Sequence, residues 1–115
     1  MTDRVFASED LAEVCGDDAD FQHEVIVDFL ARLDSQIDAI AAAVESGDPV
    51  AVQRAAHALK GSSVSVGGRT VVEACQNLES LGRAGTLDDA GAVVERLRDQ
   101  AGLLRDALGV YLRAA

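Results

Sequence analysis

The chain has 115 residues, of which 49% are hydrophobic, and its formal net charge is −10. This length fits one domain with its own core and is too short for two, so we expect a single domain over residues 1–115. The negative charge argues against general binding to nucleic acids or to anionic membranes, because both require a basic surface. No apolar run approaches the roughly 20 residues that cross a bilayer, and the N-terminus lacks the apolar segment of a secretory signal, so we expect a cytoplasmic protein.

The first part of the chain predicts two helices. Ser8 is a candidate N-cap for a brief helix that stops near Gly16. Asp17 or Asp18 then opens a long helix with one apolar stripe on a 3.6-residue period, which should face the core. The stripe consists of Phe21, Val25, Phe29, Leu33, Ile37, Ile40 and Val44.

A third helix follows the turn at Gly47. Asp48 is its expected N-cap and Pro49 its first residue, since proline fits the first helical position. Gly67 and Gly68 should end it. Ser63 lies on its inward side and is expected to bond a backbone carbonyl one turn back. The inward seam consists of Val52, Ala56, Leu59, Ser63 and Val66.

Two more helices complete the chain. Thr70 and Glu73 have capping-box spacing and are expected to start a fourth helix that ends at Gly85, and Thr86 with Asp89 repeats this spacing before the last helix. No segment shows strand alternation, and the connections are short. We therefore predict an all-α fold, an up-down antiparallel four-helix bundle with an additional short N-terminal helix. The expected core positions are Val71, Ala74, Cys75, Leu78 and Leu81, then Val94, Leu97, Ala101, Leu104, Leu108 and Tyr111.

The third helix carries a distinctive polar patch. At 100° per residue, His57 lies roughly 140° from the inward seam and should point to solvent. Lys60 and Gly61 are its neighbours one turn on, and Arg54 is its neighbour one turn back. A glycine inside a helix costs about 1 kcal/mol relative to alanine, so Gly61 suggests that something approaches the backbone beside His57; close helix packing is the alternative.

The charges around this patch are unusual for so acidic a chain. Lys60 is the only lysine, and between residues 49 and 72 the charged residues are Arg54, Lys60 and Arg69, with no Asp or Glu. Val50 and Val64 lie seven residues on either side of His57 and should be exposed on its face. We predict that these two valines, with the two arginines, belong to a docking surface for a partner protein.

The chemistry of these residue types suits phosphoryl transfer. A neutral imidazole has a nitrogen lone pair that can attack phosphorus and form a phosphoramidate. Phosphoryl transfer depends mainly on positioning and charge compensation, and Lys60 can supply an ammonium group for the phosphoryl oxygens. Gly61 would leave room for the donor. His57 is therefore the candidate phosphoacceptor.

The segment His57-Ala58-Leu59-Lys60-Gly61-Ser62-Ser63, followed by Val66-Gly67, resembles the H-x-L-K-G-x-S-x-x-x-G motif of histidine-containing phosphotransfer (HPt) domains. Leu78-Glu79 also matches the family's usual pattern on the next helix, while Gly68 departs from it. The resemblance implies that His57 accepts phosphate through Nε2 and that Lys60 faces the phosphate. It implies a monomer whose partners are receiver domains of response regulators or hybrid kinases. Those domains would carry the phosphorylated aspartate and the Mg²⁺, and this chain would need no metal or cofactor.

Other interpretations remain open at this stage. The patch could serve a helical docking adaptor that is never phosphorylated, and a metal-binding bundle using His57 or His23 is a third, weaker hypothesis. The sequence lacks the glycine-rich nucleotide loop that a kinase would need. We therefore expect a stoichiometric carrier and not an enzyme. His23 is interpreted as an ordinary surface residue. Glu79 is interpreted as a solvated surface carboxylate, and the alternative is that it reaches the phosphate region across the bundle. The two cysteines, Cys15 and Cys75, are interpreted as small buried hydrophobes.

Overall fold

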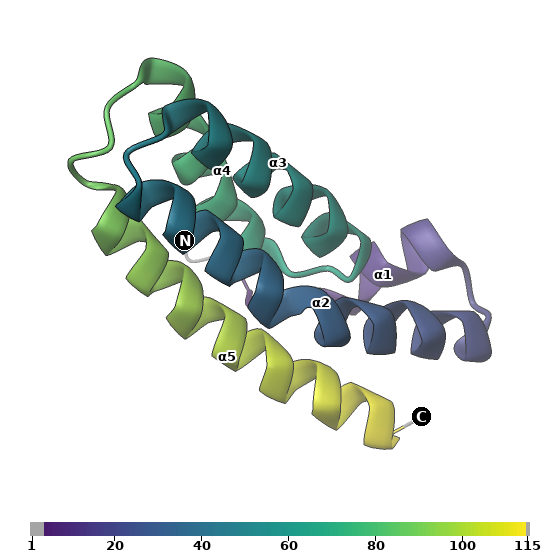
Figure 1. Cartoon of the computed structure of the whole chain (residues 1–115). Coiled ribbons are helices and arrows are strands. Elements are labelled where there is room, and N and C mark those ends of the chain that lie inside the picture. Colours follow the sequence, from purple (N-terminus) through teal and green to yellow (C-terminus); the bar gives the residue numbers. More distant parts are fainter. Residues whose placement is uncertain (1–3, 115) are drawn as a thin grey trace.

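The computed structural model describes residues 4–114, which form five α-helices and contain no strand. Helices α2, α3, α4 and α5 pack in cyclic order, each against two neighbours, while α1 lies against α2 and α3 at one end (Figure 1). Short turns make successive long helices antiparallel, so the predicted four-helix bundle with a short N-terminal helix is confirmed. The helices are α1 Ser8–Cys15, α2 Ala19–Glu45, α3 Pro49–Ser65, α4 Arg69–Ala84 and α5 Ala90–Ala114.

The start of α1 differs from the prediction. Ser8 is the first helical residue, and Ala7 occupies the N-cap position without a side-chain hydrogen bond. Backbone contacts explain this start, because the amide of Ala7 donates to the carbonyl of Gly67 at 2.9 Å. Gly67 has a φ of +71°, and a Cβ there would lie 2.2 Å from the carbonyl oxygen of Ala7. The chain before α1 is thus fastened to the turn between α3 and α4, and only glycine fits at that turn.

The apolar stripe of α2 is shifted at its N-terminal end. Asp18 caps the helix as predicted, accepting from the amide of Phe21. Phe21, however, is 47% exposed, and Gln22 lies in the buried position instead. Gln22 can be buried because its amide donates to the carbonyl of Gly16 and accepts from the hydroxyl of Tyr111. Farther along, the predicted positions Phe29, Leu33, Ile37 and Ile40 are buried, and Val25 and Val44 are partly buried.

Helix α3 agrees closely with the sequence prediction. Asp48 accepts from the amide of Ala51, and Pro49 is the first helical residue. The Ser63 hydroxyl donates to the carbonyl of Leu59 at 2.7 Å, one turn back. The whole predicted seam is buried: Val52, Ala56, Leu59, Ser63 and Val66. Because this seam faces inward, the opposite face of α3 is directed to solvent.

Helix α4 does not begin with the predicted capping box. It starts at Arg69 after Gly68, no side chain caps it, and the buried hydroxyl of Thr70 has no hydrogen-bond partner within the described residues. A Cβ at Gly68 would come within 2.6 Å of the Leu104 side chain of α5. This close packing fixes the turn, so the helix begins directly after it. Helix α5 begins at Ala90, immediately after Asp89.

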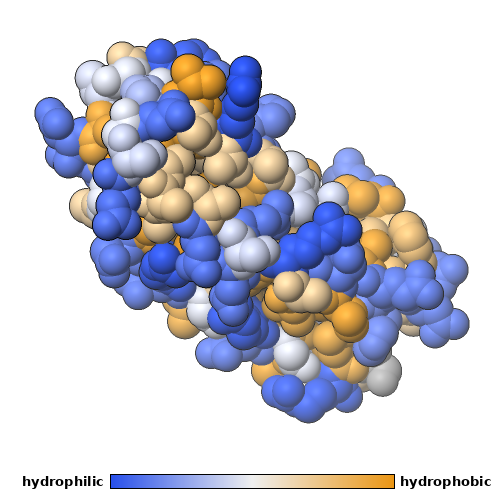
Figure 2. Space-filling model, in the orientation of Figure 1, coloured by the Kyte–Doolittle hydropathy of each residue, from blue (hydrophilic) through white to orange (hydrophobic). Residues whose placement is uncertain are grey.

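Both cysteines are free and buried, as predicted. Burial raises the pKa of the Cys75 thiol to about 12, which makes it unreactive at neutral pH. Among the described helices, none is long and apolar enough to cross a membrane. Figure 2 shows that hydrophilic side chains are interspersed over the face drawn there, with an apolar area over α2 and α3.

Candidate functional site

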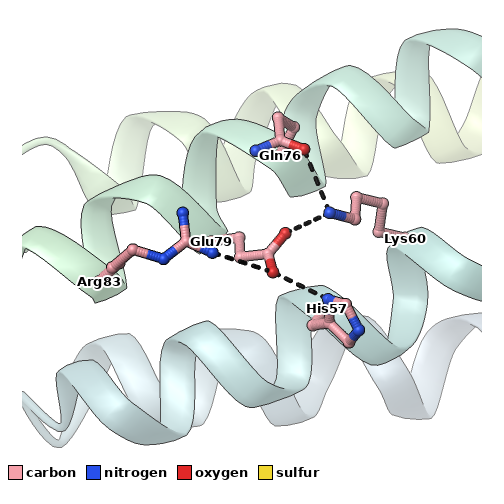
Figure 3. Close-up of polar contacts among 5 residues, drawn as sticks. All are labelled: His57, Lys60, Gln76, Glu79 and Arg83. Atoms are coloured by element: carbon pink, nitrogen blue, oxygen red, sulfur yellow. Dashed lines mark hydrogen bonds and ion pairs between the residues drawn. The ribbon is translucent and has the colours of Figure 1, made fainter.

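The site lies between α3 and α4, beside a point where the two helices are in close contact. A Cβ at Gly82 of α4 would lie 2.7 Å from the carbonyl oxygen of Pro49 and 2.8 Å from the amide nitrogen of Gln53. The two backbones are therefore nearly in contact at this level. One turn before Gly82, Glu79 is directed from α4 toward the polar face of α3 (Figure 3).

His57 is on that face and points to solvent, as its helical phase predicts. Its side chain is 70% exposed, and its Nδ1 lies 2.8 Å from Oε2 of Glu79. Figure 3 shows the other ring nitrogen, Nε2, directed away from this carboxylate. An ionised carboxylate can only accept a hydrogen bond, so it favours the tautomer that carries the proton on Nδ1. In this tautomer the lone pair of Nε2 faces solvent.

Glu79 is not the solvated surface residue that we inferred from the sequence. Its side chain is only 5% exposed, and it receives the ammonium of Lys60 on Oε1 at 2.5 Å. The guanidinium of Arg83 lies 3.5 Å from Oε2, the oxygen that also contacts His57. The hydrogen bond from Lys60 is the main reason why the pKa of Glu79 lies below its usual value; burial opposes this effect and the bond to His57 adds to it. The carboxylate is therefore ionised at neutral pH.

The position of Glu79 in the sequence indicates that its carboxylate is buried and paired. Glu79 directly follows Leu78 and lies one turn after Cys75, so it is at the edge of the apolar stripe of α4. A carboxylate at such a position is seldom buried without a cationic partner. The partners come from α3, nineteen residues away for Lys60, and periodicity along α4 alone does not reveal them.

Lys60 lies between α3 and α4. Its ammonium donates to Glu79 and also to Oε1 of Gln76 at 3.1 Å, and its side chain is only 23% exposed. Gly61 is exposed, and a Cβ built there would have no atom within 4 Å. The alternative that Gly61 serves close helix packing is therefore wrong. The surface beside His57 is open at Gly61.

The predicted docking residues do not all lie together. Val50 and Val64 are both exposed, and Arg54 is exposed on the same helix as His57. Arg69 instead forms a two-pronged ion pair with Asp10 of α1, at 2.8 and 2.9 Å. Arg69 and Val64 line the same groove, which does not include His57, so Arg69 lies near one docking valine and not beside the imidazole.

Histidine and acidic side chains do not form a metal site in residues 4–114, where no group of three His, Cys, Asp or Glu side chains could hold an ion. His23 is exposed on α2, as predicted. The arrangement is thus a helical bundle that presents the imidazole of His57 to solvent, with Nδ1 held by a buried carboxylate and Nε2 directed away from it. Such a site can provide a nitrogen nucleophile.

Comparison with known proteins agrees with a helical bundle that uses an exposed histidine as a nucleophile. A family model for the Hpt domain matches residues 24–107, and the chain belongs to this family. Its members are phosphocarrier proteins and not kinases, and in two-component systems they interact with receiver domains of response regulators or hybrid kinases. The chain therefore has a histidine phosphotransfer role in a phosphorelay.

Solved structures share the fold at low sequence identity. The histidine-containing phosphotransfer protein B (HptB) from Pseudomonas aeruginosa PAO1 is 22% identical, with a TM-score of 0.89 over 99% of each chain. The HPT domain of an Hpt sensor hybrid histidine kinase from Shewanella is 20% identical, with a TM-score of 0.82 over 96% of each chain. No curated protein sequence matches the chain significantly.

Proposed function

We propose that His57 is the residue that carries the phosphoryl group, through Nε2. The observation that supports this most directly is the contact between Nδ1 and the buried carboxylate of Glu79 at 2.8 Å. It orients the ring and leaves Nε2 exposed to an incoming donor. His23, the other histidine, has no such carboxylate contact among the described residues.

The donor in this proposal is the aspartyl phosphate of a receiver domain. The lone pair of Nε2 attacks phosphorus, a P–N bond forms, and the P–O bond to the aspartate breaks, so that its electron pair returns to the carboxylate. The proton on Nδ1 stays in place, and the positive charge of the phosphorylated ring is balanced by Glu79. Attack by the aspartate of a second receiver on the same phosphorus reverses these steps. The receivers would supply the Mg²⁺, and this chain needs no cofactor.

Lys60 and Gly61 have supporting roles in this proposal. The sequence predicted that Lys60 faces the phosphate; its bond to Glu79 supports a positioning role, in which Lys60 holds the carboxylate that orients His57. Gly61 leaves an open surface where the receiver's active site must approach His57. Val50 and Val64, exposed before and after His57 on the same helix, would contact the receiver at the rim.

The chain would act stoichiometrically, without a kinase activity or nucleotide site of its own. We further propose a cytoplasmic monomer that does not bind nucleic acid, which agrees with its net charge of −10. The absence of nucleic-acid binding follows from the acidic composition. The stoichiometric role follows from the partners, because receiver domains both donate and accept the phosphoryl group.

The test is transfer of labelled phosphate from a phosphorylated receiver domain to the purified chain. We expect acid-labile label on the wild type and on His23→Gln, and none on His57→Gln. Because His57 is exposed, His57→Gln should keep its helical circular dichroism and its melting temperature. Label that persists on His57→Gln would refute the assignment. Stable binding of a receiver without any label would favour the docking adaptor.

A further inference from the structure

A cleft of about 580 Å³ lies beside His57, on the side toward the N-terminal end of α3 and the C-terminal end of α4. His57 and Glu79 form part of its wall, and two arginines, Arg54 from α3 and Arg83 from α4, lie beside them. Glu79 is the only acidic residue of the lining, and its oxygens are already engaged by His57 and Lys60. The cleft lining is Val50, Gln53, Arg54, His57, Glu79 and Arg83.

Both guanidinium groups are available to a new partner. The side chain of Arg83 is 59% exposed, and its contact with Glu79 is long, at 3.5 Å. Arg54 is exposed, and no hydrogen bond or ion pair joins it to another residue between 4 and 114. An exposed guanidinium with at most one weak contact can change partners at little energetic cost.

Lys60 differs from the two arginines in its exposure and in the strength of its existing contacts. It is mostly covered, it donates to Glu79 at 2.5 Å and to Gln76 at 3.1 Å, and it does not line the cleft. If Lys60 turned toward a phosphoryl group, the buried carboxylate of Glu79 would lose its shortest contact. A buried charge that loses its partner is costly, so this exchange is disfavoured.

We propose that Arg54 and Arg83 bind the phosphoryl oxygens once the group is on Nε2 of His57, while Lys60 stays bound to Glu79. The proposal rests on His57 being the phosphoacceptor. Arg83 lines the same cleft as His57, and its guanidinium lies 3.5 Å from Oε2 of Glu79. Because Nε2 is directed away from that oxygen, the exposed side chain of Arg83 has to turn from Glu79 toward the phosphoryl group. Arg54 is one helical turn before His57. The planar guanidinium donates parallel hydrogen bonds that match phosphoryl oxygens.

A receiver-free experiment tests this proposal. Phosphoramidate can transfer its phosphoryl group to Nε2 and release ammonia, so the protein is phosphorylated without any docking partner. The ³¹P resonance of the phosphohistidine is then titrated with pH. Cations that bind the phosphoryl group favour its dianion and lower its second pKa. The variants are Arg54→Gln, Arg83→Gln, their double variant, Lys60→Gln and, as a matched exposed arginine on α5, Arg96→Gln.

Each arginine variant in the cleft should raise the second pKa of the phosphoryl group by about half a unit, the scale of an exposed ion pair. The double variant should show the larger shift, and 1 M salt should reduce the differences. Arg96→Gln should match the wild type, and Lys60→Gln should shift the pKa less than either cleft variant. A larger shift for Lys60→Gln, or no shift for the cleft variants, would overturn the proposal.

Failure of the underlying assignment would look different. If His57 were not the phosphoacceptor, the ³¹P resonance would be absent from the wild type or would persist in His57→Gln. If only the arginine proposal were wrong, the ³¹P resonance would still depend on His57. The second pKa of the phosphoryl group would then be the same in the wild type and in the Arg54 and Arg83 variants. The same samples therefore separate the two hypotheses.

Discussion

Oε2 of Glu79, a buried residue of α4, lies 2.8 Å from Nδ1 of His57, an exposed residue of α3. The carboxylate cannot donate a proton, so this contact determines which ring nitrogen carries the hydrogen and which one carries the free lone pair. Lys60 keeps Glu79 ionised by donating to its other oxygen. The reactivity that we assign to α3 thus depends on a side chain of α4.

Replacing Glu79 by Gln should slow transfer from a phosphorylated receiver by at least about tenfold. The amide is similar in size but uncharged, so it neither fixes the Nδ1 proton nor balances the ring charge, and a hydrogen bond to a charged group is worth about 1.5–3 kcal/mol. Rapid-quench measurement of labelled phosphate checks the rate, and circular dichroism checks the fold. Glu73→Gln, an exposed carboxylate on the same helix, is the control. Equal rates for wild type and Glu79→Gln would show that the contact has no role in the reaction.

The stability of the protein should fall in acid because several carboxyl groups, including those of Glu79 and Asp10, have lowered pKa values. That of Glu79 is lowered mainly by Lys60, and that of Asp10 mainly by its hydrogen bonds from Arg69. A carboxyl group whose pKa is lower in the folded state stabilises the fold above its ordinary pKa, and this contribution disappears as the pH falls through the lowered value. The ordinary values are 4.5 for Glu79 and 3.8 for Asp10, so the loss should begin near these values and continue below them.

Urea denaturation at a series of pH values measures this loss. The free energy of unfolding of the wild type should decrease with pH below about 4.5, and Glu79→Gln and Asp10→Asn should each show a shallower decrease. Each variant should also be less stable than the wild type at neutral pH, because Lys60 or Arg69 then lacks its anionic partner. Parallel pH profiles for all three proteins would contradict the assignment of these ion pairs.

Local sequence signals predicted α3 almost completely. The N-cap at Asp48, the proline at position 49 and the inward seam all depend on residues within a few turns of one another, and the exposure of His57 follows from the seam. The phase of α2 near Phe21 was predicted wrongly for the opposite reason. Gln22 is buried there because Tyr111, at the far end of the chain, donates to it.

In the candidate site, too, local sequence signals did not reveal contacts with residues from another helix. The residues on α3 were identified from their own spacing, but Glu79 and Arg83 belong to the site only because α4 packs closely on α3 at Gly82. Arg69 was grouped with the basic residues around His57, yet it pairs with Asp10, fifty-nine residues earlier. A helical period places a residue on a face, whereas its charged partner depends on which helices are neighbours.

Docking of the receiver should depend on the two exposed valines near His57. Val50→Ser and Val64→Ser together should weaken binding of a receiver and slow transfer from it by about tenfold, because each loses apolar area that the partner would cover. Phosphorylation by phosphoramidate should be unchanged, since it needs no docking. Val110→Ser, an equally exposed valine on α5, is the matched control. A similar loss in the control, or none in the double variant, would place the docking surface elsewhere.

Gly61 and Gly82 lie in helices but are expected to have different roles. Gly61 leaves room for the receiver beside His57, whereas Gly82 allows α4 to pack closely on α3. Gly61→Ala should stabilise the fold by up to about 1 kcal/mol, because the new methyl group meets no atom within 4 Å and alanine favours the helix. It should nevertheless slow transfer from a receiver, because the methyl group occupies the open surface beside His57. Gly82→Ala should instead destabilise the fold, since its Cβ would lie 2.7 Å from the carbonyl oxygen of Pro49. Thermal melts and transfer rates measure both effects. A Gly61→Ala protein that is more stable and transfers at the wild-type rate would show that the receiver does not approach His57 over Gly61.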